Sequence, residues 1–249
     1  GINAYKYVDD MTLVECRTRD EPSNMQSAVT DLASWSEANH MELNATKCFA
    51  MEVNFSRKPT VLPAIRVDGL ELQSVNTIKL LGILIQSDLK WESNVTDIIR
   101  RANGNFTCYI SKKRHCLPVR VLLTIYDGYV RPILEYGTPV WNSGITKKQC
   151  ESLEKIQKRA LRIIVGARYT TYQNVLTCFD METLEQRRRL LCTSFIGKSI
   201  SRNQLKNILL QITQKRVLRH TKKLPELRCR TNRVKNSPIP SLVRIYNSS

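Results

Sequence analysis

The sequence predicts an α+β fold in which a sheet-dominated first part is followed by an all-helical part. Up to about residue 90, short runs of branched and aromatic residues alternate with turn residues, which is typical of strands joined by hairpins. From Trp91 onward the apolar residues recur every three or four positions, as in amphipathic helices. Charge divides at almost the same point: residues 1–97 hold 9 Lys and Arg against 14 Asp and Glu, whereas residues 98–249 hold 30 against 8.

Composition narrows the class of protein. The 249 residues carry a formal net charge of +17 and are 42% hydrophobic, so the chain can bury a core and is not a disordered basic tail. No apolar run approaches the roughly 20 residues that a membrane span needs. The eight cysteines form no C-x-x-C pair, which favours reduced thiols over a zinc site. We expect an intracellular protein, nuclear or cytoplasmic and not secreted, whose partner is a polyanion.

The first hairpin carries the clearest candidate chemistry. Two β-prone runs, 5–8 and 11–14, flank Asp9 and Asp10, which predicts two carboxylates at a hairpin tip. Adjacent carboxylates repel unless a cation or a shared proton lies between them, and Mg²⁺ prefers oxygen ligands while keeping positions for phosphate oxygens and water. The pair therefore suits nucleotidyl transfer, although for the dipeptide alone a solvated turn is the better explanation, since Asp is common in turns.

One helix and three further strand signals complete the first part. Apolar residues at helical spacing over 25–35 predict a helix, and the spacing of Ser23 and Gln26 predicts a capping box at its start. Alternation predicts a half-buried strand over 48–55, and Asp68-Gly69 predicts a second hairpin. The apolar run 80–85 predicts a further buried strand, with Gly82 where the backbone bends or approaches another segment closely.

The helical part begins with an amphipathic stretch from Ile98 that leads into a basic cluster at Lys112, Lys113 and Arg114. After Pro118 a second helix is predicted, which Pro132 should kink or end, with its apolar face at Leu122, Ile125, Tyr129 and Ile133. A third helix, 151–165, has one apolar face, formed by Leu153, Ile156, Ala160, Ile163 and Ile164, and one basic face, formed by Lys155, Lys158, Arg159 and Arg162. Beyond residue 169 we expect basic helices to about Lys223 and then a loosely ordered tail, because Pro238 and Pro240 break helices.

Tyr7-Val8-Asp9-Asp10 in a hydrophobic hairpin matches the Y-x-D-D motif of reverse transcriptases, and the chain resembles that family in the same order over about residues 5–195. Residues 25–48 resemble the next motif of the polymerase palm, 79–82 the primer grip, and Trp91 onward the helical thumb. The more specific resemblance is to enzymes of non-LTR (LINE, jockey-like) retrotransposons, and it rests on the blocks 79–83, 129–136, 139–141 and 156–164.

The resemblance implies a role for individual residues. Asp9 would bind the catalytic Mg²⁺ ions directly, and Asp10 would contribute more weakly. Lys47 would protonate or neutralise pyrophosphate, and an ordinary surface lysine is the alternative. Tyr7 and Val8 would lie near the primer terminus, and Leu81 and Gly82 would hold the primer strand, unless they only form a buried strand.

The basic residues would complete the enzyme as phosphate contacts. Lys155, Lys158, Arg159 and Arg162, together with the 112–114 cluster, would bind an RNA template and DNA primer without selecting a sequence. The alternative is a solvated helix face. Deoxynucleoside triphosphates would be the second substrate.

The family resemblance implies an incomplete enzyme. Its active site requires a further aspartate and template-binding fingers from earlier in the chain, so we expect the C-terminal half of a palm over 1–75, primer-grip strands over 76–91, a thumb over 92–168 and a basic helical extension over 169–249. Such a fragment would lack polymerase activity alone. Two alternatives stay open: a non-catalytic nucleic-acid-binding remnant of a retroelement, and a basic DNA-binding protein in which Tyr-Val-Asp-Asp occurs by chance.

Overall fold

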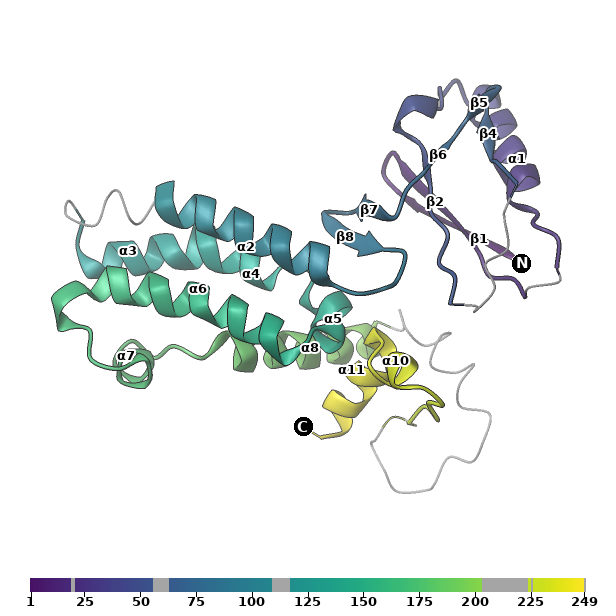
Figure 1. Cartoon of the computed structure of the whole chain (residues 1–249). Helices are drawn as coiled ribbons and strands as arrows, with labels where there is room; N and C mark the ends of the chain where they lie inside the picture. The colour runs from purple at the N-terminus through teal and green to yellow at the C-terminus, as the bar shows by residue number, and fades with distance from the viewer. Residues whose placement is uncertain (19–20, 56–62, 109–116, 203–223, 225, 249) are drawn as a thin grey trace. The chain divides into compact units, whose positions relative to one another are not determined.

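The computed structural model describes residues 1–18, 21–55, 63–108, 117–202, 224 and 226–248. The chain forms two compact units, Gly1–Leu89 and Lys90–Ser249. The first contains short strands and one long helix, and the described regular elements of the second are all helices (Figure 1). The predicted α+β class is therefore confirmed. No helix within the described ranges is long and apolar enough to cross a membrane.

Within its described residues, the first unit has four two-stranded sheets. The predicted first hairpin is confirmed: β1 (Ile2–Tyr7) pairs antiparallel with β2 (Asp10–Glu15). The Asp68-Gly69 hairpin is also confirmed, between β4 (Arg66–Val67) and β5 (Leu70–Glu71). The remaining pairs are β3 (Phe49–Ala50) with β6 (Gln73–Ser74), which run parallel, and β7 (Thr77–Leu80) with β8 (Ile83–Gln86), which run antiparallel.

The prediction of one buried strand over 80–85 is wrong. Leu81 and Gly82 both have a positive φ, 46° and 82°, and form a two-residue turn between β7 and β8. Positive φ at both central residues is the turn geometry that matches the twist of a tight hairpin. Gly82 adopts this conformation without strain because it has no Cβ, whereas for Leu81 the same conformation is strained.

Helix α1 (Met25–Ala38) covers the predicted helical range, but its predicted capping box is wrong. Ser23 instead donates its hydroxyl to Glu15 Oε2 at 2.7 Å. Gln26 is hydrogen-bonded to the backbone of Arg66, 40 residues further along the chain. Its amide nitrogen donates to the Arg66 carbonyl, and its amide oxygen accepts from the Arg66 N–H. Side chains that could have closed the cap therefore fasten α1 to β2 and β4.

The predicted half-buried strand over 48–55 is mostly wrong. Only Phe49 and Ala50 are in a strand, while Phe49, Val53 and Phe55 are exposed. Among the described residues of the first unit, Val29 and Val67 are the fully buried apolar side chains. The core of this unit is accordingly small.

The second unit is built from helices whose bounds follow. They are α2 (Glu92–Phe106), α3 (Val119–Ile125), the π-helical η3 (Tyr126–Val130), α4 (Arg131–Glu135), α5 (Thr138–Trp141), α6 (Lys147–Val165), α7 (Tyr172–Cys178), α8 (Leu184–Ser201), α10 (Asn232–Lys235) and α11 (Pro238–Asn247). Short 3₁₀ turns, η1 (Ala45–Lys47) in the first unit and η4 (Asn142–Gly144) and η5 (Gly166–Arg168) in the second, join some of the elements.

The main core of the second unit lies between α2, the α3–η3–α4 segment and α6. The predicted apolar face of α6 is confirmed, since its residues are buried or half-buried. Trp141 is fully buried and donates its indole N–H to the carbonyl of Tyr136 at 2.8 Å. A smaller second core joins α8 to α11 through Cys192, Ile196, Leu242 and Val243.

The predicted apolar face of the second helix is confirmed for Leu122, Ile125 and Ile133, which are in the main core or packed against it. It is wrong for Tyr129, which is 54% exposed in a π-helical turn, while Tyr126, Val130 and Leu134 are buried. Pro132 follows this turn directly and has no N–H to bond the carbonyl of residue 128, so the normal helical ladder is interrupted there. Asn105 donates its side-chain amide to the Tyr129 carbonyl at 2.9 Å, which satisfies a backbone group at the interruption.

The prediction of a loose tail is wrong for its described residues. Pro238 and Pro240 lie in the first turn of α11, where backbone N–H groups have no helical partner, so they start this helix and do not break it. Asn247 then exchanges two hydrogen bonds of 2.8 Å with the backbone of Leu224. Residues 203–223 lie outside the described ranges, so the prediction of helices up to Lys223 is not tested there.

Burial within the main core predicts the effect of one pair of matched substitutions. Leu134→Ala should lower the free energy of unfolding by about 2–5 kcal/mol, because Leu134 is 0% exposed and its removal leaves a cavity. Leu190→Ala, on a side chain that is 53% exposed, should change it by less than about 0.5 kcal/mol. Urea unfolding of both variants measures the difference, and equal effects would contradict the assigned core.

Candidate functional site

The two candidate catalytic carboxylates lie at the end of the β1–β2 hairpin. Tyr7 pairs with Asp10 across the strands, so Val8 and Asp9 form the turn and Asp10 is the first residue of β2. Both carboxylates are exposed. Val8 has a φ of 53°, a left-handed conformation that β-branched residues rarely adopt. The turn therefore holds Asp9 and Asp10 next to each other on a strained backbone.

The hairpin has two different faces, as strand alternation requires. One face, with Met11 and Leu13, is half-buried, and Lys6 on the same face places its ammonium group 5.1 Å from the ring centre of Trp35 in α1. The other face carries Tyr5, Tyr7 and Asp10, with both tyrosines exposed. One face therefore packs in the unit while the other is available.

The available face, together with Lys6 from the other face, forms a pocket with the end of β7 and the turn that follows it. The pocket has a volume of about 440 Å³, and its walls are largely apolar. Its lining consists of Tyr5, Lys6, Tyr7, Asp10, Thr12, Val14, Leu80 and Leu81. Two segments more than 60 residues apart, the hairpin with the carboxylates and the Leu80-Leu81 segment, thus meet at one cavity.

The pocket contains part of the predicted site and adds residues to it. Tyr7, Asp10 and Leu81 are in its lining, while Val8, Asp9, Gly82 and Lys47 are not. Lys47 is exposed on η1, whose cap is made by the side chain of Asn44. Sequence reasoning missed Tyr5, Lys6, Thr12, Val14 and Leu80; alternation from Tyr7 would have found Tyr5, and cross-strand pairing would have added Thr12 and Val14.

Asp9 and Asp10 fit part of a magnesium site. Mg²⁺ is commonly bound through one or two carboxylates, with phosphate oxygens and water filling the other positions. Throughout the described part of the chain, no group of three or more Asp, Glu, His or Cys side chains is placed to hold a metal ion. The pair can therefore supply two ligands, and further oxygens would come from a substrate or solvent.

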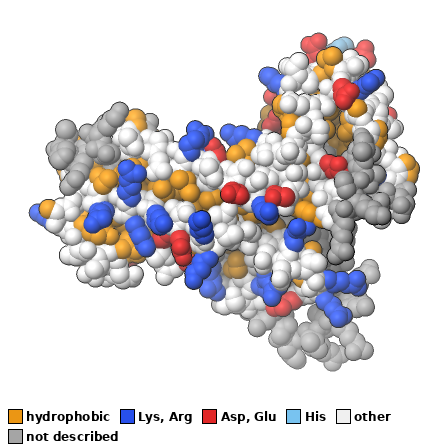
Figure 2. Space-filling view, viewed as in Figure 1, with side chains coloured by type: hydrophobic (Ala, Val, Ile, Leu, Met, Phe, Trp, Pro, Cys, Tyr) orange, Lys and Arg blue, Asp and Glu red, His pale blue; other side chains and the backbone are white. Residues whose placement is uncertain are grey.

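The predicted basic face of the third helix is presented by α6. Lys155, Lys158, Arg159 and Arg162 are all exposed, opposite the buried apolar residues of the same helix. Figure 2 shows Lys and Arg side chains gathered along the visible face of the second unit, around α6. Lys112, Lys113 and Arg114, the other predicted basic cluster, lie outside the described residues.

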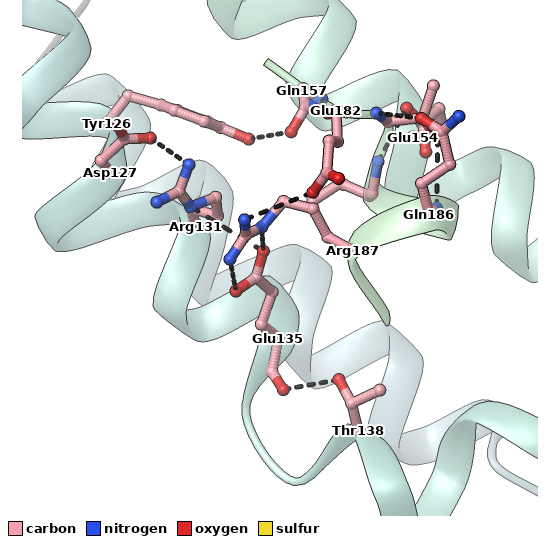
Figure 3. Close-up of polar contacts among 12 residues, drawn as sticks. Tyr126, Asp127, Arg131, Glu135, Thr138, Glu154, Gln157, Glu182, Gln186 and Arg187 are labelled. Atoms are coloured by element: carbon pink, nitrogen blue, oxygen red, sulfur yellow. Dashed lines mark hydrogen bonds and ion pairs between the residues drawn. The ribbon is translucent and has the colours of Figure 1, made fainter. Parts of the chain in front are cut away.

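A buried polar network connects α6 with its neighbours (Figure 3). Tyr126 donates its hydroxyl to Gln157 Oε1 at 2.7 Å, and the Gln157 amide donates to the hydroxyl of Tyr172 and to the carbonyl of Glu182. Tyr172 in turn donates to the carboxylate of Glu154. Burial raises the pKa of both tyrosines, and for Tyr172 the Glu154 carboxylate raises it further, so both stay protonated as donors.

The two charged residues of the 129–136 block, Arg131 and Glu135, both form ion pairs. Arg131 contacts Asp127 at 2.7 Å, and Arg187 of α8 binds Glu135 at 2.5 Å (Figure 3). The bond to Glu135 raises the pKa of Arg187, while burial raises that of Asp127. These residues hold α4 against α8, so this motif contributes structure to the helical unit.

Paired carboxylates on a hairpin and an exposed cationic helix are features that suit a polymerase acting on nucleic acid. Comparison with curated proteins confirms the resemblance to reverse transcriptases of non-LTR retrotransposons. The chain is 24% identical over 168 residues to the probable RNA-directed DNA polymerase from transposon X-element of Drosophila melanogaster. It is 23% identical over 171 residues to the probable RNA-directed DNA polymerase from transposon BS of the same organism.

Each match covers 66% of the chain but only 18% of the relative, so the chain spans about a fifth of the length of these proteins. No family model matches the sequence. No solved structure matches the chain either.

The strained turn predicts an unusual effect of glycine. Val8→Gly should raise the free energy of unfolding of the first unit by about 1 kcal/mol, because glycine adopts positive φ without the cost that a branched side chain incurs. Val14→Gly, at an exposed position inside β2, should lower it, since glycine weakens a strand. Hydrogen exchange of the β1 and β2 amides reports both changes, and a loss of protection in Val8→Gly would contradict the strain.

Proposed function

We propose that the chain is part of an RNA-directed DNA polymerase of a non-LTR retrotransposon, which extends a DNA primer on an RNA template. The observation that carries the proposal is the pocket shared by the Tyr7-Val8-Asp9-Asp10 hairpin and the Leu80-Leu81 segment. The similarity of the chain to two probable RNA-directed DNA polymerases from transposons also supports the proposal. A cavity of this volume, with apolar walls and a carboxylate at its edge, suits the end of a nucleic-acid strand.

In this proposal the first unit contributes the C-terminal portion of the palm. Asp9 and Asp10 hold Mg²⁺, which when bound would activate the primer 3′-hydroxyl and neutralise the leaving pyrophosphate. The apolar face with Tyr5 and Tyr7 holds the terminal primer nucleotide, and the turn at Leu81-Gly82 limits its movement. Lys47 is the proposed contact for pyrophosphate.

The second unit supplies the thumb and its basic extension in this proposal. The exposed cations of α6 contact successive phosphates of the template–primer duplex, which positions it without selecting a sequence. The charge of this unit supports the assignment, since residues 90–249 hold 31 Lys and Arg against 10 Asp and Glu. Deoxynucleoside triphosphates are the proposed second substrate.

A second candidate function is nucleic-acid binding without catalysis. It is favoured by the fact that the basic face of α6 lies wholly within the helical unit and does not depend on the hairpin. The two functions differ in what they require of Asp9 and Asp10, so metal binding at the hairpin separates them.

Metal binding should depend on the paired carboxylates. With Mn²⁺ as a paramagnetic substitute for Mg²⁺, the backbone amide signals of Tyr7 to Met11 should broaden in NMR spectra. Asp9→Asn and Asp10→Asn should each weaken the apparent affinity by roughly tenfold or more, because each removes one of two protein ligands. This measurement needs no polymerase activity.

Asp68→Asn is the matched control, since Asp68 is also exposed in a two-residue hairpin turn but has no adjacent carboxylate. It should leave the broadening at Asp9 and Asp10 unchanged. Equal broadening in wild type and Asp9→Asn would contradict the metal site and leave the non-catalytic function. Primer extension by the 249-residue chain itself, lost in Asp9→Asn, would contradict the proposal that the chain holds only part of the catalytic site.

Nucleic-acid affinity should depend on α6. Changing Lys155, Lys158, Arg159 and Arg162 together to Ala should weaken binding of an RNA–DNA hybrid duplex. The slope of log affinity against log salt should become shallower by about 3, because each lost phosphate contact contributes about 0.7–0.9. Fluorescence anisotropy over a range of salt concentrations measures both quantities.

A control with the same change in net charge is available. Arg120, Lys198, Arg202 and Lys235 are exposed cations on or beside α3, α8 and α10, and their change to Ala should leave most of the slope intact. An equal loss of slope in both quadruple variants would mean that total charge alone determines binding, and the α6 interface would fail.

A further inference from the structure

The cations of the helical unit differ in what holds them. On α2, Arg100 and Arg101 pair with Asp97, at 2.6 and 2.8 Å. Although burial alone would raise the pKa of Asp97, the two arginines lower it. Arg131 and Arg187 are likewise paired with carboxylates. Such cations are partly neutralised by their partners before any ligand arrives.

Three of the four cations on the basic face of α6 lie against aromatic rings. Lys158 Nζ lies 5.1 Å from the ring centre of Tyr172, and Arg162 Cζ lies 5.8 Å from that of Tyr169. Arg159 Cζ lies 5.3 Å from the ring centre of Phe106. Across the described ranges, no ion pair joins Lys155, Lys158, Arg159 or Arg162 to a carboxylate.

The rings lie on both sides of the basic face. At 100° per residue, Lys158 and Arg162 turn to one side of Lys155, whereas Arg159 turns to the other. The rings of Tyr169, which follows α6, and Tyr172, in α7, contact the cations on the first side. Phe106, at the end of α2, serves the second. The rings thus flank the stripe of cations.

A ring and a carboxylate fix a cation with different consequences for its charge. A carboxylate cancels the charge, whereas the face of an aromatic ring attracts the cation and leaves the net charge unchanged. A long side chain that is already restrained also loses less conformational entropy when it binds a ligand. An arginine that lies over a ring keeps its in-plane N–H donors for phosphate oxygens.

We propose that Tyr169, Tyr172 and Phe106 are positioning residues that hold Arg162, Lys158 and Arg159 ready for the phosphates of a nucleic acid without neutralising them. This inference rests on the proposed nucleic-acid interface of α6. The rings touch the cations and not the phosphates, so their removal lowers affinity without changing the number of ionic contacts.

Tyr169→Leu tests the inference, because it removes the ring and keeps an apolar side chain against Leu161 and Val175. With an RNA–DNA hybrid duplex as the probe, affinity should fall about twofold to fivefold while the salt slope stays the same. Tyr169→Phe, which keeps the ring, should bind the duplex with wild-type affinity. Arg162→Ala should lower both affinity and slope, the slope by about 0.7–0.9.

A double-mutant cycle separates positioning from an effect on folding. In an Arg162→Ala background, Tyr169→Leu should cause no further loss of affinity, since the ring has no cation left to hold. A full additional loss there, or wild-type affinity in Tyr169→Leu alone, would overturn the inference. If the quadruple α6 variant binds normally, the proposed interface fails; if it binds weakly and Tyr169→Leu binds normally, only the role of the rings fails.

Discussion

Burial of the apolar face of α6 is the interaction on which the helical unit depends. Leu153, Ile156, Ala160 and Ile164 fill the main core, and Leu161 anchors α7 from a neighbouring face. Because one side of this helix is committed to packing, the opposite side is fixed in orientation toward solvent. The placement of four cations on that side is thus a consequence of core packing. A substitution that disrupts the packing of α6 in the core would therefore also disturb the alignment of the four cations on its exposed face.

The first unit works under a different constraint, since its described residues bury few apolar side chains. Isolated two-stranded sheets are only marginally stable, and here long-range polar contacts such as those between Gln26 and Arg66 assist the packing. Strained positions occur at hairpin turns, including Val8 beside the paired carboxylates and Leu81 in the lining of the pocket. Strain of this kind persists only where surrounding contacts enforce it.

Much of the architecture could be predicted from the sequence, because the relevant signals are local. The change from strand to helical periodicity located the helical unit, and the two faces of α6 followed from its spacing. The first hairpin was predictable from its β-prone runs, although its turn is Val8-Asp9 and not Asp9-Asp10. The proposed roles of Tyr7, Val8, Lys47, Leu81 and Gly82 came from the resemblance, because charge and periodicity alone do not supply them.

What could not be predicted depends on contacts between distant residues. Ser23 and Gln26 have capping-box spacing but are used elsewhere, while the same spacing forms true capping boxes at Thr146 with Gln149 and at Thr183 with Gln186. The pocket joins segments far apart in sequence, so alternation could indicate its hairpin side but not Leu80 and Leu81. Within the π-helical turn Val130 is buried and the predicted Tyr129 is exposed, which single-period reasoning does not anticipate.

Tyr172 belongs to two parts of the molecule at once. Its ring lies under the ammonium group of Lys158, and its hydroxyl joins the buried network of Gln157 and Glu154. A ligand that occupies the surface of α6 would therefore act on a side chain whose other end helps to join α6, α7 and the start of α8. Binding and folding of the helical unit would then be thermodynamically linked, with occupancy outside reinforcing order inside.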